Sequence, residues 1–211
     1  EVEVTVDDGN GNTVSQIINV TVTDTATSMS ISNSTLDENG AGTVIGTIDT
    51  YIDDTSSQGS FTYSISGDGS DSFEIVNGEL KLKDGVSLDF ETKTSYALTV
   101  TATDAGGPST STVFNITVND VNDAPTAVLL SSLGVPEQID GAVVGTISTS
   151  DQDSGDTHTY SISDDRFEIV GGQLKLKAGN TVSYADEATI TLSITTTDAA
   201  GETFTQDFTL L

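Results

Sequence analysis

The sequence contains no cysteine, no tryptophan and a single histidine, His158. Without cysteine there can be neither a disulfide framework nor a thiolate metal site. One histidine cannot form an imidazole cluster, and nothing around it indicates nucleophilic catalysis. Any bound metal ion is therefore expected to have oxygen ligands.

Basic residues are scarce. The chain has 6 Lys+Arg against 33 Asp+Glu, a net charge of 6 − 33 = −27 over 211 residues. This balance argues against nucleic acid or an anionic membrane surface as a partner and favours a cation. The hydrophobic content of 35% is dominated by alternating Val, Ile and Leu, which indicates folded units with buried cores rather than disorder.

Long apolar runs and enzyme motifs are also missing. No run approaches the ~18 apolar residues of a membrane span, so no direct membrane insertion is expected. The chain opens at Glu1 without a signal peptide and with a strand-like pattern, so we expect a fragment of a longer protein. No nucleophile elbow, phosphate loop or zinc motif occurs, and we predict that the protein is not an enzyme.

Internal repeats organise the sequence. TYSIS occurs at 62–66 and again at 159–163, and FEIV followed by LKLK occurs at 73–83 and at 167–177. The spacing is close to a hundred residues. Residues 3–24 match only the last part of a repeat. The predicted division is a partial upstream repeat at 1–24 that contributes two strands, and complete domains at 25–124 and 125–211.

Each complete repeat has the pattern of an all-β unit. Short runs alternate apolar and polar residues between turns rich in Gly, Asn, Asp and Ser, and no segment has a helical period. In the first repeat the expected strands are 28–32, 44–49, 61–66, 73–76, 80–83, 96–104 and 112–119. Seven short strands in a hundred residues predict tandem Greek-key β-sandwiches of the immunoglobulin-like class.

Acidic residues gather where one repeat passes to the next. DVNDAP, at 120–125, places two carboxylates and a carboxamide within four residues. Asp89 and Glu91 are two residues apart, as are Asp151 and Asp153, and in extended chain that spacing points both side chains to one face. Calcium takes six to eight hard oxygen ligands at about 2.3–2.6 Å, so each pair is suited to share one ion.

These motifs carry a family resemblance that covers residues 28–211. LDFE at 88–91, ATDAG at 102–106 and DVND at 120–123 resemble a cadherin domain of the kind found in large bacterial surface proteins, and VPE at 135–137 with SDQDSG at 150–155 resembles a second. The resemblance implies up to three Ca²⁺ ions at the junction. Carried over by position, the ligands are Glu38, Asp89, Glu91, Asp120, Asn122, Asp123, Asp151, Asp153 and Asp198, with backbone carbonyls near Val121 and Ala124.

The implied ligand set contains eight carboxylates. Like charges about 4 Å apart repel by roughly 4 kcal/mol per pair at an effective dielectric near 20, and three divalent cations would nearly neutralise them. We therefore expect calcium to stiffen the joint in an extracellular, cell-surface or secreted extender with a role in cell adhesion. The expected partners are calcium ions and neighbouring repeats of the same chain, with other copies of the chain or surface glycans or proteins as further candidates.

The other junctions have poorer ligand sets. Upstream, Asp24 is followed by Thr25, Ala26 and Thr27 instead of the full DVND, and the paired-acid position reads Ile52 and Asp54. Asp49, Asp53, Asp54 and Asp104 could still bind an ion there. At the far end Glu137 is present, but the LDFE position reads Val182, Ser183, Tyr184 and Ala185. We expect partial or no calcium occupancy at both, unless Asp186 and Glu187 compensate through a register change.

Several alternatives remain open. A carbohydrate-binding or protein-binding module is one, although 5 Tyr and 7 Phe with no Trp leave little for an aromatic sugar platform. A filament or dimer that pairs through a hairpin at 1–24 is another. His158 is expected to be an exposed turn residue rather than a ligand, and GDGSDS at 67–72 a hairpin loop.

Overall fold

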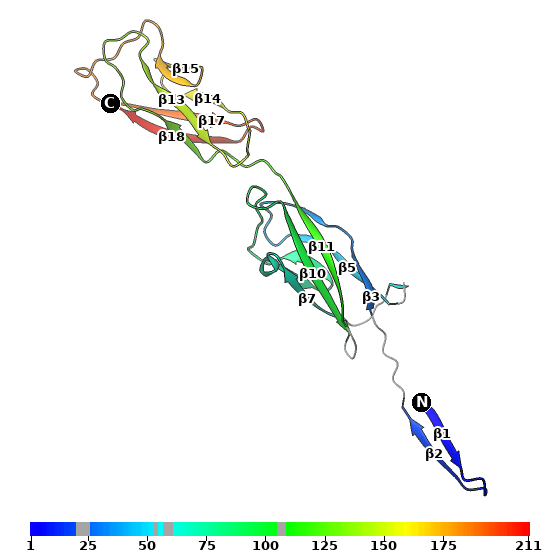
Figure 1. The fold of residues 1–211 in the computed structure, drawn as a ribbon. Coiled ribbons are helices and arrows are strands. Elements are labelled where there is room, and N and C mark those ends of the chain that lie inside the picture. Colours follow the sequence, from blue (N-terminus) through cyan, green and yellow to red (C-terminus); the bar gives the residue numbers. More distant parts are fainter. Residues whose placement is uncertain (20–25, 53–54, 57–60, 105–108) are drawn as a thin grey trace. The chain divides into compact units, whose positions relative to one another are not determined.

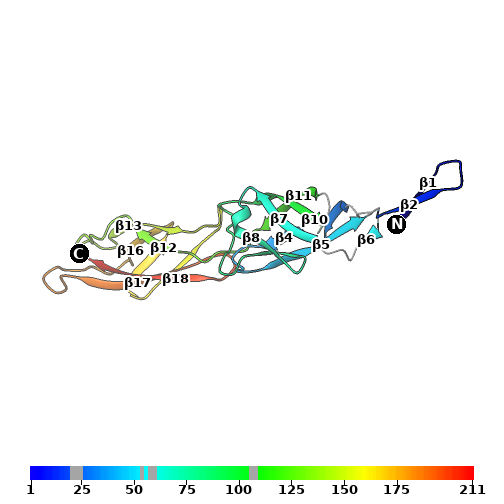
Figure 2. The ribbon, with the colours of Figure 1, turned by 90° about the horizontal axis from the view of Figure 1, so that it is seen from below.

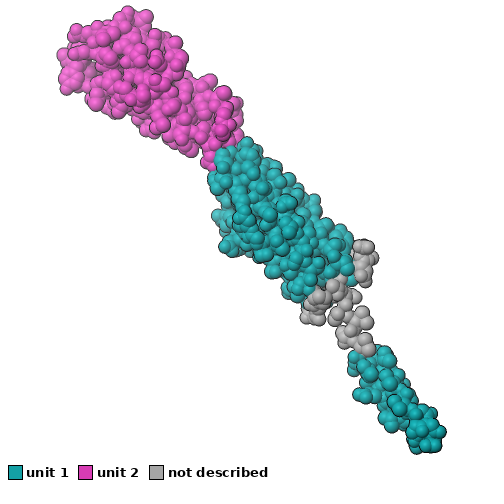
Figure 3. Space-filling view, in the orientation of Figure 1, with its two compact units in different colours: residues 1–120 teal, residues 121–211 magenta. Residues whose placement is uncertain are grey.

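The computed structural model describes residues 1–19, 26–52, 55–56, 61–104 and 109–211. The chain forms two compact units, Glu1–Asp120 (unit 1) and Val121–Leu211 (unit 2), coloured teal and magenta in Figure 3. Both are built from strands, and the described part of unit 1 also holds one short 3₁₀ turn, Ser70–Ser72. The predicted all-β sandwich class is confirmed, whereas the predicted domain limits stay a prediction.

Unit 1 begins with a hairpin of β1 (Val2–Asp7) and β2 (Thr13–Ile18), whose side chains are all exposed. Cross-strand partners include Val2 with Ile18 and Val6 with Val14. Because partners in an antiparallel pair share a face, one face of the hairpin is almost wholly apolar.

The sandwich of unit 1 has two sheets (Figure 1). In one sheet the strand order is β4 (Thr35–Asp37), β11 (Ser109–Asn119), β10 (Ser95–Asp104) and β7 (Phe61–Gly67). In the other it is β3 (Ala26–Ile31), β5 (Val44–Ile52), β9 (Glu79–Leu82) and β8 (Phe73–Val76), with β6 (Thr55–Ser56) paired to β5. The strand pattern predicted these elements except β4, which is too short to show a period, and β6.

Unit 2, whose residues are all described, has the same two-sheet arrangement but no strand that corresponds to β4. One sheet has the order β12 (Ala127–Leu130), β13 (Val143–Ser150), β16 (Gln173–Leu176) and β15 (Phe167–Val170), and the other β14 (Thr159–Ile162), β17 (Ile190–Thr197) and β18 (Thr203–Leu210). In Figure 2, β13 and β16 lie along one side of the unit and β17 and β18 along the other. The layers are those of a sandwich.

Alternation along the strands supplies each unit with its own core. On β10, Leu98, Val100 and Ala102 are fully buried, and on β17 Leu192 and Ile194 are buried at the same spacing of two. Each unit contains one cluster of buried apolar residues. Because neither cluster draws on the other unit, each sandwich has the apolar packing expected of an independently folded domain.

Equivalent glycines create a bulge in each repeat. Pairing shifts register between Val44 and Gly46 on β5 and between Val143 and Gly145 on β13. A Cβ on Gly46 would lie 2.6 Å from the carbonyl oxygen of Asn33, and one on Gly145 would lie 2.9 Å from the backbone nitrogen of Ser132. Only glycine fits such a close backbone approach, which explains the shared VxGTI sequence.

Candidate metal-binding residues

Glu38 is the most deeply buried predicted ligand of unit 1, with 3% of its surface exposed. It follows β4, which runs parallel to β11, and its backbone N–H donates a 3.2 Å hydrogen bond to the carbonyl of Asn119. The N–H of Phe90 donates a 2.7 Å hydrogen bond to Glu38 Oε2. These two bonds place Glu38 between the segment 88–91 and the end of β11, which leads to Asp120.

Asp89 is held by the turn that follows it. Its carboxylate accepts 2.9 Å hydrogen bonds from the backbone N–H and from the hydroxyl of Thr92, and its carbonyl accepts one from Lys93 N at 3.0 Å. The turn therefore fixes the backbone on which Asp89 and Glu91 are displayed. In unit 1 the side chain of Glu38 contacts the LDFE segment, and the joint metal-binding role of Glu38, Asp89 and Glu91 stays a prediction.

The linker residues of unit 2 bind to its loops. Asn122 Nδ2 donates a 2.9 Å hydrogen bond to Asp198 Oδ2, and the backbone N–H of Asp123 donates one of 2.7 Å to Asp153 Oδ2. Asp153 N in turn donates to Asp151 Oδ1 at 3.1 Å. Within unit 2, five of the predicted ligands, which come from three distant stretches of sequence, are thus linked by hydrogen bonds.

Asp198 is 6% exposed, yet its carboxylate is well supplied with donors. Besides Asn122, the backbone N–H groups of Gly201 and Glu202 donate to Oδ1 at 2.6 and 2.8 Å. The hydrogen bond from Asn122, followed by the backbone bonds, lowers the pKa of Asp198 below its usual value although burial opposes this. Asp198 is therefore held as a carboxylate, the form in which it can bind a cation.

The carboxylate of Asp153 bears on whether the residues of unit 2 suit a calcium ion. Its Oδ1 atom is buried and has no hydrogen-bond partner, although Oδ2 accepts from Asp123. A buried carboxylate oxygen without a partner is costly unless a cation or water satisfies it. The surrounding donor set of carboxylates, a carboxamide and backbone carbonyls is of the hard-oxygen type that calcium prefers. The residues of unit 2 fit a calcium ion.

His158 differs from the sequence-based expectation. Its side chain is only 13% exposed, and Nε2 lies 2.7 Å from Oδ2 of Asp151, whose side chain is 5% exposed. The prediction of an exposed turn residue is therefore wrong. The loop between β13 and β14 folds back on itself and carries His158 onto the first aspartate of the SDQDSG motif. Asp156, in the same loop, was not singled out in the sequence at all.

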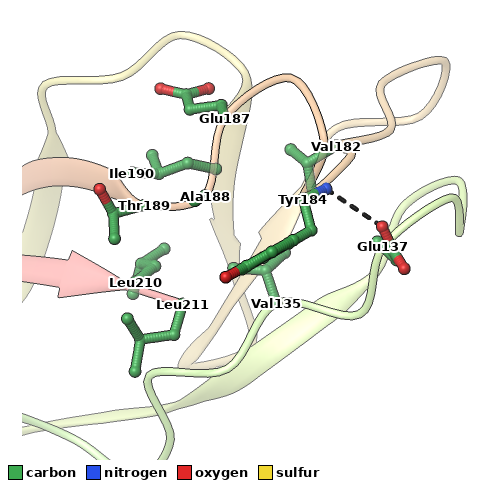
Figure 4. A pocket seen from close by; sticks show the side chains of 10 residues that line it. All are labelled: Val135, Glu137, Val182, Tyr184, Glu187, Ala188, Thr189, Ile190, Leu210 and Leu211. Atoms are coloured by element: carbon green, nitrogen blue, oxygen red, sulfur yellow. Dashed lines mark hydrogen bonds between the residues drawn. The ribbon is translucent and has the colours of Figure 1, made fainter.

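Figure 4 shows the far end of unit 2, where Glu137 lies beside Tyr184. Tyr184 N donates a 3.1 Å hydrogen bond to Glu137 Oε2, so Glu137 contacts the same segment as Glu38 does in unit 1. Glu187, the nearby acid considered as a substitute, forms a 2.7 Å ion pair with Arg166. A pocket lined by Tyr184 and by apolar side chains such as Val135 and Leu210 occupies this end.

The upstream junction falls partly outside the described residues, which omit Asp24, Thr25, Asp53 and Asp54. Asp49 lies on β5 opposite Ser30, and Asp104 ends β10 opposite Phe61. The expectation of weak or no calcium binding there stays a prediction. In the central set, Val121 is an exposed residue of unit 2 whose expected role is through its backbone carbonyl.

Comparison with known proteins finds a family match for the first repeat. Residues 32–119 match the model of the Cadherin domain. The mouse protein "Cadherin-related family member 2" is 43% identical over 104 residues, which are 47% of this chain and 8% of that protein. Human "Protocadherin gamma-A4" is 32% identical over 182 residues, 80% of this chain and 19% of the relative. The chain thus spans about a fifth or less of these relatives.

Solved structures support the same fold over most of the chain. Human protocadherin-24 EC1-2 aligns with a TM-score of 0.64 and 19% identity, covering 89% of this chain and 97% of the other. Drosophila N-cadherin EC1-4 aligns with a TM-score of 0.63 and 24% identity, covering 88% and 49%. The described part of the chain includes no helix with the length and apolarity needed to cross a membrane.

Proposed function

We propose that the two sandwiches are consecutive cadherin-type repeats and that calcium, bound by residues of both units, stiffens the segment that joins them. The observation that carries this proposal is the arrangement of the linker in unit 2. Asn122 and Asp123 are hydrogen-bonded to Asp198 and Asp153, two carboxylates whose sequence positions lie far from the linker. These two hydrogen bonds support the proposed ligand set of unit 2.

Unit 1 supplies the other half of the proposed ligand set. Glu38 is anchored to the amide of Phe90, and Asp120 is the last residue before the linker. Calcium would act as a bridging cation for both halves, with Glu38, Asp89, Glu91 and Asp120 from unit 1 and the oxygens of residues 121–123, 151, 153 and 198 from unit 2. The mechanism is mechanical, because shared ions restrict rotation about the linker, and it includes no catalytic step.

The role that follows is that of an extender or adhesion segment. The cadherin-domain match supports an extracellular, cell-surface or secreted protein. Extracellular modules commonly bind calcium at about 10⁻⁴–10⁻³ M, so the ambient calcium concentration would set the stiffness of the joint. The relatives named above come from mouse and human, so the inferred bacterial-type parent protein stays a prediction.

Calorimetric titration of the whole chain with calcium tests the proposal, with Asp123→Ala as the variant and Asp165→Ala as the matched control. Asp165 is an exposed aspartate between β14 and β15. Asp123→Ala is expected to weaken calcium binding by more than about tenfold, since even outer-shell changes cost that much at metal sites. Equal calcium affinity in the wild type and both variants would contradict the shared site.

Self-association through the N-terminal hairpin is a second candidate function. The apolar face of β1 and β2, which carries Val2, Val4, Val6, Val14 and Ile18, is exposed. Exposed apolar sheet faces and strand edges favour pairing with another chain. The mass in solution of the wild type and of a Val4→Thr/Val6→Thr variant tests self-association, which the variant should weaken. A monomeric wild type would exclude this role and would leave the calcium proposal unaffected.

Glycan binding has weaker support. Among the described residues, Tyr184 is the one aromatic side chain that ranks with the exposed large apolar groups, at 69%. One ring offers little of the stacking surface that sugar recognition uses. A glycan array with and without calcium would test this alternative.

A further inference from the structure

A mixed cluster of two carboxylates and the imidazole stands in the loop between β13 and β14. One ligand atom from each of Asp151, Asp156 and His158 lies within 4.8 Å of the others. His158 Nε2 and Asp151 Oδ2 are 2.7 Å apart, and both side chains are largely buried. All three residues belong to unit 2, so this cluster is complete without unit 1.

The backbone of the loop places these groups. Asp156 N donates a 3.3 Å hydrogen bond to the carbonyl of Asp153, and Gly155 has a φ of 93°, a conformation that side-chain-bearing residues rarely adopt. The resulting turn carries Asp156 and His158 back toward Asp151. Asp151 is oriented in addition by Asp153 N, which donates to its Oδ1 at 3.1 Å. Such outer contacts hold metal ligands in place.

One atom of the cluster has a hydrogen-bonding capacity that the protein does not satisfy. Asp156 Oδ1 accepts a 2.6 Å hydrogen bond from Thr157 N, but Oδ2 is buried and has no partner. A buried carboxylate oxygen that no donor or cation satisfies is energetically unfavourable. A cation at this position would remove that penalty and would also replace the bond between His158 and Asp151.

The ligand atoms of this cluster, two carboxylate oxygens and one imidazole nitrogen, indicate which kind of cation would bind there. Calcium is bound by oxygens, whereas an imidazole nitrogen beside carboxylates suits zinc and related divalent transition metals. Zinc sites commonly have three protein ligands at about 2.0–2.2 Å and keep a fourth position for water. The three ligand atoms lie within 4.8 Å of one another, and binding of such an ion would require them to move closer together.

We propose that Asp151, Asp156 and His158 form a binding site for a divalent transition-metal ion of the zinc type. The site is separate in chemistry from the proposed calcium set but shares Asp151 with it. Zinc bound to Asp151 would withdraw one ligand from calcium, so zinc is expected to weaken calcium binding. The existence of the zinc site does not depend on calcium binding at the junction, whereas this competition does.

His158 is the only histidine, which gives a site-specific readout. Zinc chloride is titrated into the full chain without calcium, at slightly alkaline pH, while the imidazole ¹⁵N resonances are followed by NMR. One set of signals is expected to shift and saturate at one equivalent. Absence of a shift, or a shift that never saturates, would overturn the proposal.

Two variants locate the ligands. Asp156→Asn keeps His158 and its contact with Asp151 but removes a charged ligand, so the zinc affinity reported by the same resonances should fall by more than about tenfold. Asp165→Asn, an exposed aspartate of the next turn, should leave it unchanged. His158→Gln should abolish the one-equivalent binding in calorimetry. Equal zinc affinity in the wild type and Asp156→Asn would refute this ligand set.

Calcium titrations of the same proteins separate the two proposals. With the zinc site intact and calcium bound at the junction, one equivalent of zinc should reduce the calcium affinity of the wild type but not that of His158→Gln. If calcium fails to bind while zinc still shifts the His158 signals, the calcium proposal fails and the zinc site stands.

Discussion

The backbone N–H of Phe90 donates a 2.7 Å hydrogen bond to Oε2 of Glu38, and the second repeat has the same bond, at 3.1 Å, from Tyr184 to Glu137. The residue that follows each glutamate, Asn39 or Gln138, has a positive φ and donates to the carbonyl of Leu88 or Val182. The two repeats therefore build the same cradle for a glutamate. Only in the first repeat does the segment that donates to the glutamate carry two acids, Asp89 and Glu91.

This equivalence makes a matched pair of variants. Glu38→Gln keeps an oxygen acceptor for Phe90 N but removes the charge, so the fold should persist while calcium affinity falls by more than about tenfold. Glu137→Gln makes the same change where the neighbouring acids are missing and should leave calcium binding at its wild-type level. Calorimetry measures both, and equal losses in the two variants would count against the central junction as the calcium site.

Asn122→Ala should raise the pKa of Asp198 toward its usual value, because the amide of Asn122 is the largest cause of its lowering. An NMR titration of the carboxyl carbons measures this. The matched control is Asn115→Ala, at an exposed position of β11. An unchanged pKa for Asp198 in Asn122→Ala would show that the backbone donors of Gly201 and Glu202 suffice.

Removal of calcium by a chelator should loosen the joint and leave the sandwiches folded, since each has its own apolar core. Small-angle scattering profiles are expected to differ with calcium and with chelator, while the far-ultraviolet circular dichroism spectrum stays the same. Superimposable scattering curves would contradict calcium-dependent stiffening.

Leu80 and Leu174 are fully buried at equivalent positions of β9 and β16. Replacement of either by alanine should destabilise its own unit by about 2–5 kcal/mol, because a cavity is left in a packed core. Thermal unfolding of Leu174→Ala should show the transition of unit 2 at a lower temperature and that of unit 1 unchanged. The exposed Val76 provides a control substitution to alanine, and a joint shift of both transitions would argue for one cooperative core.

Arg166 holds the pKa of Asp164 below its usual value through side-chain hydrogen bonds of 2.7 to 3.1 Å to both carboxylate oxygens. Because the pKa of Asp164 is lower in the folded protein than in the unfolded one, the ion pair stabilises the fold fully at pH values above the unfolded-state pKa of about 3.9. This stabilisation is lost as the pH falls through the folded-state pKa. Asp164→Asn should thus cost about 1 kcal/mol or less at neutral pH and nothing in strong acid. Denaturant unfolding at several pH values, with Asp165→Asn as control, measures this difference.

Local pattern was enough to predict most strands and the sandwich class. The alternation of Leu98, Val100 and Ala102 predicts one buried face, and the repeated VxGTI and TYSIS strings align the two units. These features depend on neighbours in sequence, because side chains two residues apart on a strand share a face. The sequence pattern did not predict β4, because three residues are too few to show alternation. This strand forms because it pairs in parallel with β11, which lies far along the chain.

The sequence by itself determined the alternating strands, the two repeats and an acidic, oxygen-rich ligand list centred on 120–123. Only the tertiary structure decided which carboxylate oxygens the protein satisfies: Asp153 Oδ1, from that list, and Asp156 Oδ2, from outside it, are buried without a hydrogen-bond partner. It also decided that the largely buried side chain of His158 contacts Asp151. The physical reason is that burial and hydrogen bonding in a loop follow from its backbone turns and from the elements packed around it, and neither leaves a period in the sequence.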